Sequence, residues 1–66
     1  MTAPAVRDAQ ASHAAGRHDA ARALLLRYLA AKPRDFEALC LFAEVHLALG
    51  DPAQALFATQ RALAAA

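Results

Sequence analysis

Residues that favour β-strands are nearly absent from this sequence. Isoleucine does not occur, and the β-branched positions are only Val6, Val45, Thr2 and Thr59. Alanine fills 21 of the 66 positions and leucine 10, and both are strong helix formers. These proportions exclude a strand-rich fold and predict an all-α protein.

Cysteine, long apolar runs and an excess of one charge are lacking as well. Cys40 is the single cysteine, which excludes an internal disulfide and agrees with a reducing compartment. No run approaches the roughly 18 apolar residues of a membrane span, and Arg7 and Asp8 interrupt the N-terminal segment too early for a signal peptide. Seven basic and six acidic residues give a formal net charge of +1, which is too balanced for a nucleic-acid-binding face. We therefore expect a cytoplasmic protein that binds neither nucleic acid nor membrane.

The few glycines and prolines divide the chain at regular places. Gly16 follows an alanine-rich segment and Gly50 an apolar one, as expected where a helix ends in the left-handed conformation. Pro33 stops a further segment, and Asp51 followed by Pro52 is a typical helix start. Four helices are predicted, near residues 3–15, 18–31, 36–49 and 52–65. Their connections are short, so neighbouring helices should pack antiparallel.

The third predicted helix is apolar nearly all round. Only Glu44 and His46 are polar between Ala38 and Leu49. Such a helix must be covered on several sides. The first predicted helix is the opposite case, because Val6 is its only large aliphatic residue.

The sequence also repeats itself with a period of 34 residues. A shift by that number places Gly16 on Gly50, Arg27 on Arg61 and Leu29 on Leu63. This period predicts two consecutive helix–turn–helix repeats, residues 2–35 and 36–66, within a single module of residues 1–66.

These repeats resemble the tetratricopeptide repeat. Gly50 and Asp51 stand where that family has its inter-helix turn, and Pro33 stands where its repeat ends. Ala21 and Ala55 match the small residue at which the two helices of a repeat cross. The resemblance implies four antiparallel helices that form a fragment of an α-solenoid superhelix.

The family resemblance also implies a function in protein–protein interaction or assembly. In that family the first helices of successive repeats line a concave groove, which here should bind an apolar peptide or helix. The groove positions carried over to this chain are Val6, Gln10, His13, Glu37, Cys40, Leu41, Glu44 and Leu47. For Cys40, Leu41 and Leu47, ordinary core packing is an equally good interpretation.

Catalytic and metal-binding motifs do not stand out. The sequence has no nucleophile elbow, phosphate-binding glycine loop or H-E-x-x-H motif. We expect no enzyme activity, no cofactor and no metal site from His13, His18, His46 and Cys40. Two alternatives to the binding module stay open: an N-terminal regulatory segment of a larger bacterial enzyme such as a glycosyltransferase, and a self-assembling structural unit.

The last predicted helix carries more apolar surface than one neighbouring helix can cover. The large apolar side chains that we expect it to expose, and to use for self-association, are Leu56, Phe57 and Leu63. We therefore expect a homo-oligomer in isolation, most simply a two-fold dimer that uses the third or fourth helix.

Overall fold

The computed structural model describes residues 2–66, and all the regular structure in that range is helical. The four helices are α1 (Pro4–Ala14), α2 (His18–Ala31), α3 (Phe36–Ala48) and α4 (Pro52–Ala65). Their bounds lie within one residue of those predicted from the glycines and prolines. The all-α prediction is confirmed.

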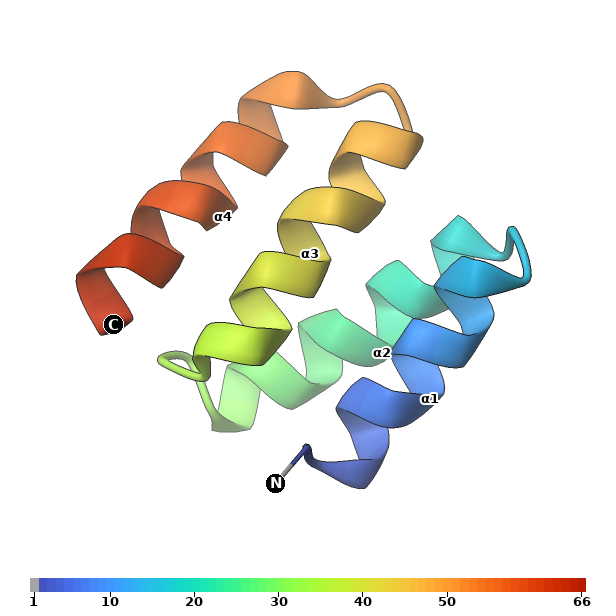
Figure 1. The fold of residues 1–66 in the computed structure, drawn as a ribbon, viewed down its shortest axis with the longest axis horizontal. Coiled ribbons are helices and arrows are strands. Elements are labelled where there is room, and N and C mark those ends of the chain that lie inside the picture. Colours follow the sequence, from blue (N-terminus) through green and yellow to red (C-terminus); the bar gives the residue numbers. More distant parts are fainter. Residues whose placement is uncertain (1) are drawn as a thin grey trace.

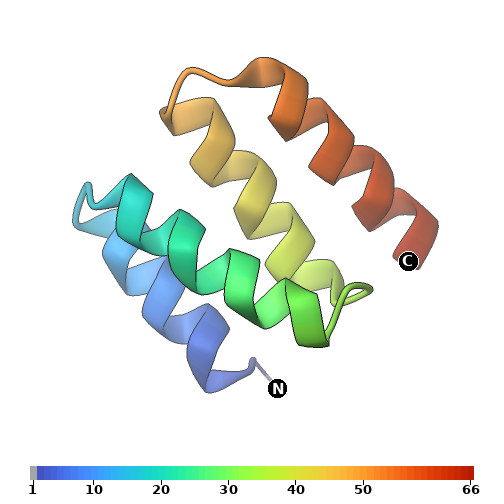
Figure 2. The same ribbon diagram turned by 180° about the vertical axis from the view of Figure 1, so that it is seen from behind.

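The helices form two antiparallel hairpins that lie side by side (Figures 1 and 2). One hairpin is α1 with α2, and the other is α3 with α4. Within the described residues, α3 packs against each of the other three helices, whereas α4 packs against α3 alone. The hairpin of α3 and α4 is therefore covered on one side only, and α4 forms an edge of the molecule (Figure 1).

The turns of the two hairpins are copies of each other, 34 residues apart. Gly16 has a φ of 82° and Gly50 a φ of 77°. The amide of the residue after each glycine donates across the turn, from Arg17 to the Ser12 carbonyl and from Asp51 to the His46 carbonyl, at 2.8 Å in both. This 6→1 hydrogen bond with a left-handed glycine is the Schellman ending of a helix. The structure therefore consists of two tandem helix–turn–helix units.

A Gly50→Ala variant should be less stable than the wild type by about 1 kcal/mol or more. A Cβ at this position would meet no atom within 4 Å, so the cost arises from the left-handed backbone and not from a clash. Urea unfolding monitored by circular dichroism measures the difference. Gly50→Asn is the control and should lose less, since asparagine tolerates this conformation better. Equal free energies of unfolding for wild type and Gly50→Ala would contradict the assigned turn.

The second hairpin begins at a carboxylate that also ties it to the first. Asp35 Oδ1 accepts the amide of Ala38 at 3.0 Å and so caps α3. The Tyr28 hydroxyl of α2 donates to Asp35 Oδ2 at 2.5 Å. This hydrogen bond and the cap hold the pKa of Asp35 below its ordinary value. Asp51 caps α4 in the same way through the amide of Gln54.

The core lies around α3, as its apolar sequence predicts. The largest fully buried side chains are Leu25, Leu39, Val6 and Val45. Seven residues of α3 are buried, but only Val6 and Ala9 of α1. No helix within residues 2–66 combines the length and apolarity needed to cross a membrane.

Candidate functional site

The uncovered side of the second hairpin carries an apolar hollow between α3 and α4. Its volume is about 300 Å³. We call its lining the open face, which consists of Phe36, Cys40, Ala43, Glu44, Leu47, Thr59, Ala62 and Leu63. Leu47 is 60% exposed and Leu63 70% exposed. Large apolar side chains therefore meet solvent here in one contiguous area.

The open face is the repeat equivalent of a surface that α3 covers in the first hairpin. A shift of 34 residues takes Cys40 to Val6 and Ala43 to Ala9 on α1, and Leu63 to Leu29 on α2. Val6, Ala9 and Leu29 are buried in the core that α1 and α2 share with α3. The second hairpin thus presents the surface on which the first hairpin receives a helix, and residues 2–66 place no helix on it.

Each α3 residue of the open face follows from helical spacing. Phe36, Cys40, Ala43, Glu44 and Leu47 stand at i, i+4, i+7, i+8 and i+11, and so lie along one side of a helix. Sequence reasoning had named Cys40, Glu44 and Leu47 but missed Phe36, Ala43, Thr59 and Ala62. The same spacing, extended one turn back from Cys40, would have found Phe36.

Two of the predicted groove residues belong to the core. Val6 is fully buried and Leu41 is 6% exposed. Neither can line a groove, because α3 packs onto α1 and α2 and leaves these positions almost no access to solvent. For Leu41, the core alternative is therefore the right one. The other α1 positions, Gln10 and His13, are not part of the open face.

Some of the remaining predicted groove residues form polar contacts within the protein. The Thr2 hydroxyl donates to Glu37 Oε2 at 2.8 Å, which ties the N-terminal segment to α3. His13 Nδ1 and His18 Nδ1 lie 2.9 Å apart across the first turn. Within residues 2–66, no cluster of three or more His, Cys, Asp or Glu side chains has the geometry to hold a metal ion. Cys40 is a half-buried free thiol.

The three α4 residues predicted for self-association do not form one patch. Leu56 is 60%, Phe57 57% and Leu63 70% exposed. Leu63 lines the open face, whereas Phe57 lines a second pocket between α2, α3 and α4. They diverge because six residues turn a helix by about 600°, which puts Phe57 and Leu63 on different flanks of α4.

The charge on the open face has one sign. Glu44 is the only charged side chain that lines it. Glu37 lies one residue beyond Phe36 on the same helix and is exposed. An occupant of this face would therefore meet an apolar centre with a carboxylate at its border.

Comparisons of this chain with models of known protein families, with curated proteins and with solved structures find no match.

Proposed function

We propose that this protein is a protein-interaction module of the tetratricopeptide kind that docks an amphipathic helix on the open face. The observation that carries the proposal is the equivalence between this face and the surface of the first hairpin that α3 covers. Burial of exposed side chains such as Leu47 and Leu63 favours association by about 1.5–3 kcal/mol for each that becomes fully buried. The sequence-based prediction places the binding groove between α1 and α3. The groove proposed here lies between α3 and α4 instead.

The chemistry of the occupant follows from α3 and from the charge on the face. The helix that covers the first hairpin is α3 itself, which buries large apolar side chains including Leu39, Phe42 and Val45. An occupant of the open face needs an apolar stripe of the same kind, with apolar residues at i, i+3, i+4 and i+7. Glu44 favours a lysine or arginine beside that stripe. We place this interaction in the cytoplasm, where Cys40 stays reduced.

A synthetic helix with this pattern should bind the protein with a dissociation constant in the micromolar range. The probe is an end-blocked peptide of about 18 residues, long enough to form a helix on the surface, with a leucine stripe and lysines elsewhere. Isothermal titration calorimetry measures its affinity. A Leu47→Glu/Leu63→Glu variant should bind at least tenfold more weakly, since two apolar contacts are replaced by carboxylates.

Two controls separate docking on the open face from general stickiness. A peptide of the same composition, with the leucines scattered around the helix, should not bind. Phe57→Glu changes an equally exposed residue on the other flank of α4 and should leave the affinity unchanged. Equal binding of both peptides, or loss of binding in Phe57→Glu and not in the open-face variant, would refute the proposal.

Self-association is the second candidate, and the polarity of α1 indicates its form. Where α3 buries Leu41 and Phe42, the repeat-equivalent positions of α1 expose Arg7 and Asp8. Head-to-tail stacking would press these charges into the apolar open face of the next copy, at a high desolvation cost. In the absence of a helix partner, two copies therefore cover each other's open faces in a closed two-fold pair.

A further inference from the structure

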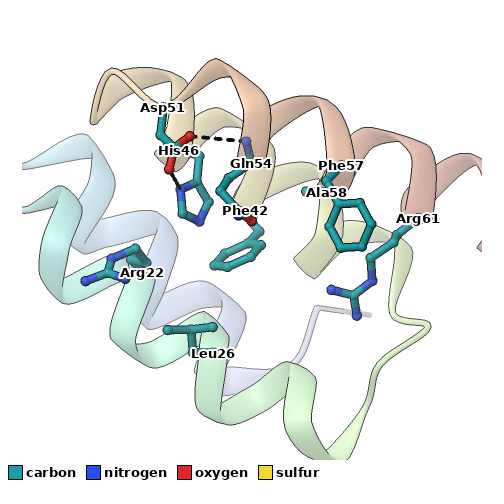
Figure 3. A pocket seen from close by; sticks show the side chains of 9 residues that line it. All are labelled: Arg22, Leu26, Phe42, His46, Asp51, Gln54, Phe57, Ala58 and Arg61. Atoms are coloured by element: carbon teal, nitrogen blue, oxygen red, sulfur yellow. Dashed lines mark hydrogen bonds and ion pairs between the residues drawn. The ribbon is translucent and has the colours of Figure 1, made fainter.

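A second pocket, of about 360 Å³, lies on the other flank of α4, and the open face takes no part in it. Figure 3 shows Arg22 and Leu26 of α2 on one side of the pocket and Phe57 and Arg61 of α4 on the other, with Phe42 and His46 of α3 between them. Asp51, Gln54 and Ala58 complete the lining. The pocket is therefore bordered by two helices and floored by a third.

Two arginines, Arg22 and Arg61, give the border of this pocket its positive charge, and neither forms a salt bridge with a described residue. Among residues 2–66, no carboxylate lies within 4.0 Å of the guanidinium group of Arg22 or Arg61. Arg61 Nη2 donates to the Pro33 carbonyl at 3.3 Å, which leaves its other N–H groups available. The one acidic lining residue is Asp51, whose Oδ1 caps α4, and its single negative charge stands against the two arginines. The net charge presented to an occupant is positive.

The centre of the pocket is apolar and open. Leu26 is 48% exposed on one wall and Phe57 57% exposed on the other. Phe42 lies on the floor, where its ring meets that of His46 edge-on at a centroid distance of 4.4 Å. An apolar side chain that enters between the two walls would be enclosed on three sides.

His46 adds an unsatisfied polar group to the floor. Its side chain is 8% exposed, and neither ring nitrogen has a hydrogen-bond partner within the protein. Buried polar groups without partners are rare in native structures and costly. An occupant that brings a hydrogen-bonding group to this floor would lower that cost.

The geometry points to this pocket as a second docking site, for an acidic linear segment of another protein. We propose that a leucine or phenylalanine of the segment lies between Leu26 and Phe57, and that carboxylates on either side of it pair with Arg22 and Arg61. Charge complementarity decides this occupant, because a basic helix that suits the open face would be repelled by the two arginines. The two sites therefore select partners of opposite charge.

The test uses the end-blocked, fluorescein-labelled peptide Glu-Asp-Leu-Phe-Asp-Glu and its neutral counterpart Gln-Asn-Leu-Phe-Asn-Gln. Fluorescence anisotropy at low salt should show the acidic peptide binding at least fivefold more tightly than the neutral one. An Arg22→Gln/Arg61→Gln variant should lose that preference, while Arg7→Gln, an exposed arginine on α1, should keep it. In wild-type protein, the amide resonances that shift on binding should be those of residues 22–26, 42–46 and 57–61.

Three results would overturn the proposal. They are absence of binding at millimolar peptide, equal affinity for the two peptides, and resonance shifts confined to the open face. Failure here is distinguishable from failure of the proposed function, because the helix-docking experiment uses a basic probe and substitutions at Leu47 and Leu63.

Discussion

A Leu39→Ala variant is expected to lose about 2–5 kcal/mol of its free energy of unfolding. Leu39 is fully buried and is one of the two largest residues in the core with no measurable exposure. Removal of its branched end destabilises the protein in two ways: the transfer free energy of the removed atoms is lost, and the cavity that remains adds a further unfavourable free energy. A chain of 66 residues is expected to have a total stability of roughly 3–10 kcal/mol. The substitution should therefore remove a large part of the stability of the protein.

Urea titration followed by circular dichroism, at low micromolar protein, measures this loss. The matched control is Leu47→Ala, the same change on the same helix at a residue that is 60% exposed, and it should cost about 0.5 kcal/mol or less. If the two variants unfold at the same urea concentration, the assignment of Leu39 to the core and Leu47 to the surface is wrong.

Purified protein should form a two-fold dimer whose dissociation constant rises at least 100-fold in Leu63→Glu. Each dimer contains two copies of every interface residue, so this single substitution removes two leucines. Burial of two large apolar side chains contributes about 3–6 kcal/mol, and every 1.4 kcal/mol changes the dissociation constant tenfold. The estimate of 100-fold uses the lower end of that range, and glutamate adds a desolvation cost.

Sedimentation equilibrium over a wide concentration range measures both constants. Phe57→Glu is the matched control, because Phe57 is similarly exposed but lies on the other flank of α4. It should dimerise like the wild type. A wild-type protein that stays monomeric at high micromolar concentration would exclude the dimer. A dimer that Phe57→Glu disrupts and Leu63→Glu does not would show that the interface is not on the open face.

The helices, their ends and the tandem arrangement all follow from local features of the sequence. Scarcity of β-branched residues and abundance of alanine decided the class. Gly16 and Gly50 ended helices, and Asp51 with Pro52 began one, because left-handed backbone, capping and a fixed proline φ act over a few neighbouring residues. Such local effects can be read without knowledge of the rest of the fold.

Which apolar residues are covered depends on how the helices pack against one another. Val6 and Cys40 occupy the same repeat position, yet Val6 is fully buried and Cys40 is half-buried, because α3 covers this face of the first hairpin and no described helix covers the equivalent face of the second. Likewise, the distance along α4 shows that Phe57 and Leu63 diverge, but not which of them faces α2. Burial depends on what lies next to a residue in space. In this chain that neighbour is another helix some tens of residues away, so periodicity marks the apolar positions and packing alone sorts them into buried core and exposed surface.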